Sequence, residues 1–271
     1  MRPNTFTLCA LLLATATTLH AQTFSTKPCP TNDEESHGVI SHWLGGGDQV
    51  CEIRSITLPL VNGRVNVHNT NGSIEIVGSD RSDVYLEAHV VARSHSPSDA
   101  ESLLHQVNIE TNGTIEAKGP HTSGMTGWSV SYKLSVPRHL AADLYTSNGS
   151  LTLAALDGNI KAETTNGGLK LDQLAGDVHV STTNGGIKAN LTGSTWQGSG
   201  LSARTTNGGV SVSVPSSYSA HLVASTTNGG TSINVPGADQ SGVHRREIDT
   251  NLGSGGPTLT FETTNGGVSI N

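Results

Sequence analysis

A nine-residue period of glycine and alternating apolar residues runs through the second half of the chain. Each unit is a glycine, one spacer and two apolar residues one position apart, and five units stand in register between Gly149 and Ala189. Successive residues of a strand point to opposite faces, so both apolar side chains of a unit lie on one side. This fixed short period predicts a β-solenoid, in which short strands stack coil upon coil.

Two units give a coil of about 18 residues with two strands and two corners. The coil signature contains Thr-Thr-Asn-Gly-Gly, and Asn-Gly tolerates the positive φ that a sharp corner is expected to need. Stacked in register, the corners would form a ladder of asparagine amides. We assign the ladder a structural role, and the alternative is a polar comb for carbohydrate or a partner strand. Its members are Asn71, Asn148, Asn166, Asn184, Asn207, Asn228 and Asn265.

A meander of β-hairpins is the alternative fold, because Asn-Gly between alternating residues is also typical of a two-residue hairpin turn. The nine-residue spacing nevertheless continues across Gly158 and Gly176, where no Asn-Gly occurs. A meander does not require equal spacing there, so we favour the solenoid. Paired units elsewhere bring the expected number of coils to seven, a rod roughly 30 Å long. Residues 194–198 and 236–256 are expected to be insertions between coils.

Three segments are expected along the chain. Residues 1–21 have the pattern of a signal peptide, with Arg2 followed by a short apolar stretch that is not long enough to span a bilayer. Residues 22–55 are expected to form an irregular N-terminal segment. Residues 56–271 are the β-repeat domain, in which residues 78–139 form an α+β insertion that caps the stack. A capping-box pattern at Ser98 predicts a short helix reaching about Gln106.

The last coil ends at Ile270 and Asn271 with no capping sequence after it. An uncovered solenoid end exposes unpaired strand edges. We therefore expect this C-terminal edge to meet a second copy of the chain or a partner strand.

Two cysteines lie beyond the signal peptide, Cys29 and Cys51. An isolated pair in an exported chain is most simply a disulfide. The alternative is a metal site, because His37 and His42 lie between the cysteines and supply the right ligand types for zinc. The spacing matches no compact zinc motif, so the disulfide is favoured and no metal is expected.

The formal net charge is −7 at pH 7, and loss of Arg2 with the signal peptide makes the rest one unit more negative. An acidic chain argues against nucleic acid and anionic lipid as partners. The sequence contains no nucleophile elbow, His-Glu-x-x-His, phosphate loop or Cys-x-x-Cys. The histidines are scattered singly. No catalytic residue and no cofactor are therefore expected.

The segment at residues 61–76 and the later Thr-Thr-Asn-Gly-Gly repeats resemble a bacterial putative adhesin family. This family is a domain of unknown function with Gly-Asp/Asn-Gly β-repeats, and head-domain putative auto-transporter adhesins are similar to it. The resemblance covers residues 56–271. It implies a repetitive β-fold at the cell envelope and no known catalytic residues.

These observations favour an exported, non-enzymatic interaction module in the periplasm or at the cell surface. It would be adhesin-like and would bind an envelope or surface protein, or a glycan, through its repeat faces or its open end. The alternative is a structural or stress-linked scaffold of the periplasm. A polysaccharide-active enzyme is a lesser alternative.

Overall fold

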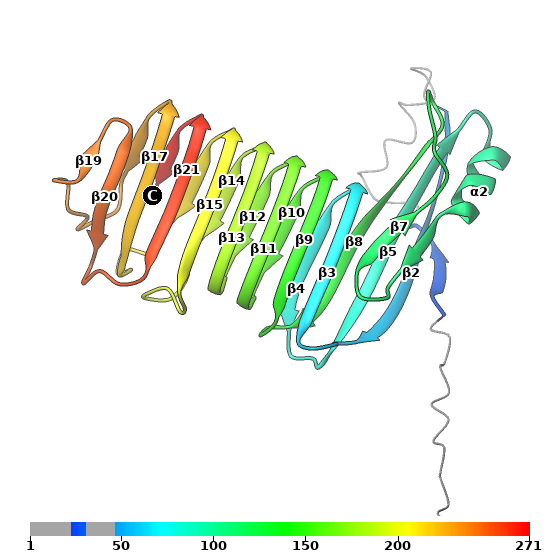
Figure 1. Ribbon diagram of the computed structural model, residues 1–271, viewed down its shortest axis with the longest axis horizontal. Coiled ribbons are helices and arrows are strands. Elements are labelled where there is room, and N and C mark those ends of the chain that lie inside the picture. Colours follow the sequence, from blue (N-terminus) through cyan, green and yellow to red (C-terminus); the bar gives the residue numbers. More distant parts are fainter. Residues whose placement is uncertain (1–22, 31–46) are drawn as a thin grey trace, which may run out of the picture.

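The computed structural model describes residues 23–30 and 47–271, and its main feature is a long stack of short strands in two facing sheets (Figure 1). Each sheet has 11 strands. The expected signal peptide, His37 and His42 lie outside the described residues. Most of the stack is built from parallel strands, one from each coil in each sheet.

The first sheet contains the shorter strand of each coil. Its order is β1 (Ser25–Pro28), β2 (Asp48–Pro59), β5 (Asp83–Ser94), β8 (Gly127–Pro137), β4 (Ile74–Ser79), β10 (Leu151–Ala154), β12 (Leu169–Asp172), β14 (Ile187–Asn190), β16 (Val210–Ser213), β22 (Val268–Ile270) and β18 (Thr231–Ile233).

The second sheet contains the longer strand of each coil. Its order is β19 (Val243–His244), β20 (Glu247–Leu252), β17 (Ala220–Asn228), β21 (Thr258–Asn265), β15 (Gly200–Asn207), β13 (Ala175–Asn184), β11 (Asp157–Asn166), β9 (Ala141–Asn148), β3 (Arg64–Asn71), β7 (Ile115–Lys118) and β6 (Asn108–Glu110).

The register between coils follows the sequence period. Leu151 pairs with Leu169, and Leu169 pairs with Ile187, in each case with parallel strands and a separation of eighteen positions. A hairpin meander would pair neighbouring strands antiparallel. The hairpin alternative is therefore wrong for the stack, whose architecture is solenoid-like.

The core lies between the two sheets and is one layer of apolar side chains from each. Leu151, Leu169 and Ile187 of the first sheet are at most 2% exposed, and Ile160 and Val178 of the second are 0% exposed. Full burial of one such side chain stabilises the fold by about 2 kcal/mol. Repeating this pair in every coil is what holds the two faces together.

Close backbone contact, rather than positive φ at asparagine, explains the Asn-Gly corners. A Cβ added at Gly185 would lie 2.0 Å from the carbonyl oxygen of Gly167 in the preceding coil. Among the described residues, the non-glycine residues with positive φ are Asn62, Ala155 and Gln173, none of which is a corner asparagine. The expectation that the asparagines adopt positive φ is wrong. Glycine is required because the stacked backbones leave no room for a side chain.

Residues 78–139 lie at the N-terminal end of the stack, which we call the capped end. There β8 pairs parallel with β4, β5 pairs antiparallel with β8, and β2 pairs antiparallel with β5. The N-terminal segment was expected to be irregular up to residue 55. This part of the expectation is wrong, because β2 is a strand of twelve residues.

Helix α2 (Pro97–Gln106) packs against this end and buries Ala100, Leu103 and Leu104. Its N-cap is Ser96, whose hydroxyl accepts a hydrogen bond from the backbone N–H of Asp99 at 3.2 Å. The sequence pattern had placed the cap at Ser98. Pro97 can occupy the first helical position because its missing N–H is not needed there, so the helix begins earlier than expected.

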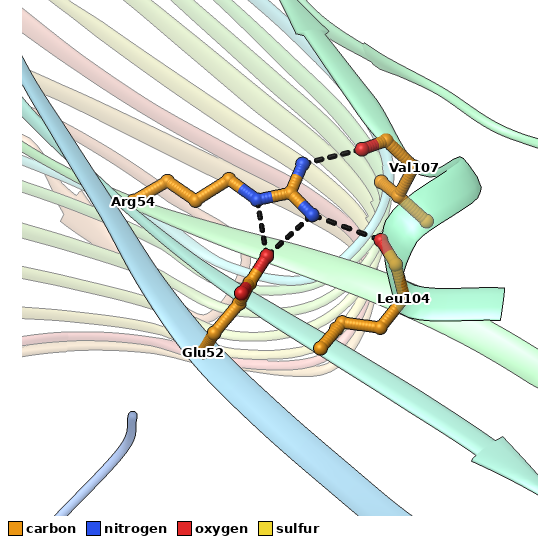
Figure 2. A network of polar contacts seen from close by, with 4 residues as sticks. All are labelled: Glu52, Arg54, Leu104 and Val107. Carbon is orange, nitrogen blue, oxygen red and sulfur yellow. Dashed lines mark hydrogen bonds and ion pairs between the residues drawn. The ribbon is translucent and has the colours of Figure 1, made fainter. Parts of the chain in front are cut away.

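Arg54 of β2 ties the C-terminal end of α2 to the sheet, as Figure 2 shows. Its guanidinium donates to the carbonyl oxygen of Leu104 at 2.8 Å and to that of Val107. Glu52, on the same strand, accepts from Arg54 at 2.5 Å. Both side chains are largely buried, and the helix carbonyls and the carboxylate together satisfy the charge.

The far end of the stack does not follow chain order (Figure 1). The C-terminal strand β21 lies between β15 and β17, and β22 lies between β16 and β18. The expectation of an open C-terminal edge is therefore wrong, because the last coil in the sequence has a neighbour on each side.

Residues of the 236–256 segment cover the outermost coil instead. Strand β20 pairs antiparallel with β17, and β19 pairs with β20. Ile248 and Leu252 of β20 are buried, at 0% and 1% exposure. The segment expected to be a simple insertion thus closes the second sheet, and we call this the hairpin end.

One core residue carries a prediction. The hydroxyl of Tyr132 in β8 is buried and has no hydrogen-bond partner in the described part of the chain. An unpaired buried polar group costs about 1–3 kcal/mol. Tyr132→Phe is therefore expected to raise the free energy of unfolding by about 1 kcal/mol, measured by urea denaturation at pH 7.

The same substitution should alter the alkaline limit of stability. Burial, and secondly the charge of Glu116, hold the pKa of Tyr132 well above its ordinary value. The unfolded chain loses this proton near pH 10 while the folded chain keeps it, so stability falls as the pH rises above 10. Tyr132→Phe should reduce that fall. Part of the fall should persist in the variant, because burial also raises the pKa of Tyr218, to about 12. If the free energy of unfolding of Tyr132→Phe fell as steeply above pH 10 as that of the wild type, Tyr132 would not be the cause of the fall.

Candidate functional site

The asparagine corners form one continuous row along the stack. The Asn166 amide donates to the Asn148 side-chain oxygen at 2.9 Å, and the Asn184 amide donates to that of Asn166 at the same distance. In spatial order the row is Asn71, Asn148, Asn166, Asn184, Asn207, Asn265 and Asn228. An amide has two N–H donors. Each link uses one of them; the other can face solvent or a ligand, except at Asn148, whose amide also donates to the carbonyl oxygen of Thr70 at 3.4 Å.

A row of buried hydroxyls runs beside the asparagines. The first threonine of each Thr-Thr pair points inward, and Thr164 and Thr182 donate to the carbonyl oxygens of Gly149 and Gly167, each at 2.8 Å. The acceptor is the corner glycine of the preceding coil. This role of the threonines was not predicted from the sequence. The sequence signal for it is the glycine directly after each corner asparagine, because the carbonyl oxygen of that glycine accepts the bond from the threonine of the next coil.

The roles of the two threonines in one Thr-Thr pair, Thr182 and Thr183, can be distinguished by mutation. Thr182→Val keeps the shape and removes the hydrogen bond to Gly167, so the free energy of unfolding should fall by about 1–2 kcal/mol. Thr183 is exposed and is the matched control. Thr183→Val should change stability by less than about 0.5 kcal/mol. If urea denaturation gave the same loss of stability for both variants, the hydrogen bond from Thr182 to Gly167 would not be what stabilises the corner.

The outward face of the second sheet carries short ion pairs rather than a concentrated charge. Lys161 lies 3.3 Å from Glu163, and Arg204 lies 3.2 Å from Glu262. His179 lies 3.0 Å from Asp177. Exposed pairs of this kind contribute little to stability. They leave a polar surface of mixed charge.

One group on this face has the residue types of a catalytic triad. His221 Nε2 lies 2.8 Å from Asp249 Oδ1, and His221 Nδ1 lies 3.3 Å from Thr258 Oγ1. The three residues come from β17, β20 and β21, far apart in sequence, so only the strand pairing could have revealed them. Nucleophilic catalysis also needs a cavity and donors for an oxyanion. None of the main cavities of the described chain is lined by these residues. Their geometry supports a polar bridge across three strands.

Two of the cavities at the capped end are lined in part by an exposed hydrophobic side chain. The first, of about 600 Å³, is lined by Asn71, Arg93, Met125 and Trp128 among others. The Trp128 indole donates to the carbonyl oxygen of Pro120 at 2.9 Å, which fixes the orientation of the ring. Asn71, the first member of the asparagine row, reaches this cavity. An aromatic ring, a guanidinium and an amide around one hollow are the groups that bind small polar ligands.

The second cavity, of about 670 Å³, opens beside β3 and β6. Leu58, Val61 and Ile109 form apolar parts of its lining, and Arg64 and Glu110 are among its polar members. Val61 and Met125 are the exposed large hydrophobic side chains of the described chain, at 63% and 48% exposure. Each lines one of these two cavities. Exposed apolar side chains at hollows are typical of interaction sites, so the capped end is the candidate binding region.

Cys29 and Cys51 are joined by a disulfide, with 5.6 Å between their Cα atoms. Both sulfurs are used in this bond, which rules out the alternative zinc site. In residues 23–30 and 47–271, no cluster of three or more histidine, cysteine, aspartate or glutamate side chains could hold a metal ion. No helix in that part of the chain has the length and hydropathy needed to cross a membrane.

Residues 141–271 match the family described as Toastrack DUF4097. The matched residues cover the stack from β9 onward. Over these residues the finding confirms the resemblance to a family defined by a domain of unknown function.

Several solved structures are similar to this chain. A putative cell adhesion protein from Clostridium sporogenes is 13% identical, and the match covers 82% of this chain and 99% of that one, with a TM-score of 0.41. A putative adhesin from Bacteroides fragilis is 11% identical over 81% and 97% of the two chains, with a TM-score of 0.42. A putative adhesin from Parabacteroides distasonis is 14% identical over 84% and 98%, with a TM-score of 0.36. No curated protein matches the sequence.

Proposed function

We propose that this protein is an exported, non-enzymatic interaction module of the cell envelope or cell surface, adhesin-like in its action. The observation that carries the proposal is the pair of cavities at the capped end, where the exposed side chains of Met125 and Val61 lie beside Trp128 and Arg64. The partner is an envelope or surface protein, or a glycan. The stack holds this binding region at one end of a rigid rod.

Two features support export. The disulfide between Cys29 and Cys51 is of the kind that persists in oxidising compartments. Residues 1–21 have the sequence pattern of a signal peptide, and we propose that they are removed. Residues 22–55 then supply the disulfide-linked start of the capped end, and residues 56–271 form the adhesin-like domain.

Antibody labelling of cells tests the location. Intact cells are compared with cells whose outer membrane has been permeabilised, with a periplasmic marker protein as the control for leakage. Labelling of intact cells supports a surface module. Signal only after permeabilisation would contradict action at the surface and favour the alternative, a structural or stress-linked scaffold of the periplasm.

Binding by purified protein tests the site. Wild-type protein is compared with Met125→Glu, which places a charge in the first cavity, and with Ser211→Glu, which places the same charge on an exposed strand of the stack. The probes are a panel of immobilised cell-wall and surface glycans and purified envelope fractions. We expect Met125→Glu alone to weaken binding. Equal binding by both variants would remove the first cavity from the site.

A polysaccharide-active enzyme is the lesser alternative, and its test includes the Asp249–His221–Thr258 group, the one set of catalytic residue types described above. Wild-type protein and His221→Ala are incubated with the same glycans, and release of reducing ends is measured. Glycan cleavage that disappears in His221→Ala would support the enzyme and contradict the non-enzymatic proposal. No release by either protein is the result expected of a binding module.

A further inference from the structure

The last coil of the chain is inserted between two coils that precede it in sequence. Strands β21 and β22 together form this coil, which we call the inserted coil (residues 258–270). It lies between the coil of β15 and β16 and the coil of β17 and β18. These two neighbours form a slot that residues 258–270 fill.

The contacts in the slot are those that any coil of this sequence type makes. The Asn265 amide donates to Asn207 at 2.8 Å and its oxygen accepts from Asn228 at 2.9 Å. Thr263 donates to the carbonyl oxygen of Gly208 at 2.8 Å. Leu259, Phe261 and Ile270 are each 0% exposed in the space between the sheets. The slot therefore recognises a corner sequence and an apolar pattern, and a second copy of the chain has both.

The link to the inserted coil is short and rich in glycine. Residues 253–257 connect β20 to β21, and Gly253, Gly255 and Gly256 have φ values of 55°, 76° and 145°. A side chain would be strained at these positions, whereas glycine can rotate between conformations. Strand β20 keeps its own pairing with β17. The inserted coil can consequently swing away on this link without loss of the hairpin that closes the second sheet.

We propose that the slot takes the inserted coil of a second copy of this chain, so that two molecules are joined by exchange of residues 258–270. Each slot is filled by an identical coil, so every contact between coils is retained and only the link changes. Exchange of an identical element is a low-cost route to a dimer, and its extent depends on protein concentration and on the hinge. This assembly does not depend on what the capped end binds.

Paired cysteines distinguish the two arrangements in the full chain. Ser211 of β16 and Ser269 of β22 are direct neighbours in the first sheet. A double variant, S211C with S269C, should be linked within one chain by a short thiol-specific cross-linker. A mixture of the two single variants, unfolded and refolded together, should give a cross-linked heterodimer only when the inserted coil of one chain enters the slot of the other.

The control replaces S269C with S232C in the mixture. Ser232 of β18 pairs with Ser269 and lies beyond β22 from Ser211, so it is not adjacent to Ser211 in either arrangement. We expect a heterodimer band with S269C that grows with the protein concentration during refolding and is absent with S232C. The proposal is overturned if the double variant cross-links within the chain while the mixed single variants give no band above the control. Failure of the double variant to cross-link would contradict the coil order itself.

A second measurement uses the link, residues 253–257. Deletion of Ser254 and Gly255 shortens the link so that the inserted coil reaches its own slot with difficulty. Light scattering after size-exclusion chromatography should then show a larger dimer fraction than in the wild type. A variant that stays monomeric with its native cooperative unfolding would count against exchange.

Discussion

Gly185→Ala is expected to lower the free energy of unfolding by about 3 kcal/mol or more, one of the largest effects of a single substitution in this chain. The new Cβ would lie 2.0 Å from the carbonyl oxygen of Gly167, and the next nearest atoms are also backbone. No side chain can move aside to relieve this contact. The coils must separate, which weakens the pairing on both sides. Urea denaturation monitored by circular dichroism measures the loss.

Other corner glycines provide graded controls. At Gly186 an added Cβ would lie 3.3 Å from the oxygen of Gly209, and at Gly230 it would lie 3.7 Å from that of Arg245. Gly186→Ala should therefore be mildly destabilising, and Gly230→Ala should be close to neutral. If Gly185→Ala and Gly230→Ala lost the same stability, close stacking would not be the reason for the corner glycines.

Loss of the disulfide is the second large effect. Replacing both Cys29 and Cys51 by serine opens a loop with a sequence separation of 22 residues. The chain-entropy relation gives a cost of about 3 kcal/mol for a loop of this length. The double variant should unfold at a lower urea concentration than the wild type, because the bridge fastens the N-terminal segment to the capped end.

Reductant provides an independent check. Wild-type protein in dithiothreitol should shift to the stability of the double variant, while the double variant itself should not respond. Mass spectrometry should confirm that the thiols of the wild type are free in dithiothreitol. If the urea midpoint were then unchanged, the disulfide would not stabilise the fold.

The strands and the inward residues of the stack could be predicted from the sequence because each coil repeats the same alternation. Leu151, Leu169 and Ile187 were placed on one face by spacing alone and are paired in that way. The strand β2 was missed because Glu52 and Arg54 interrupt the apolar alternation. They do so because Arg54 binds carbonyl oxygens at the end of α2 and Glu52 pairs with Arg54 (Figure 2).

The order of the last coils could not be predicted, because the repeat that identifies a coil makes all coils alike. Asn228 and Asn265 belong to the same corner sequence, and either coil could follow the one that contains Asn207. What decides is the segment between them. Strand β20, with Ile248 and Leu252 buried, covers the outer edge of β17. The coil of β21 and β22 therefore lies on the other side of β17, next to β15.

The direction of the hydrogen bonds also sets how the rod would respond to force. Bonds between coils lie along its long axis (Figure 1), so tension between the two ends acts on all the coil-to-coil ladders in series, and the weakest ladder breaks first. A ladder that gives way would release a coil of about 18 residues, or roughly 60 Å of extended chain. The rod would then lengthen in steps under load, which limits the peak force transmitted between its two ends.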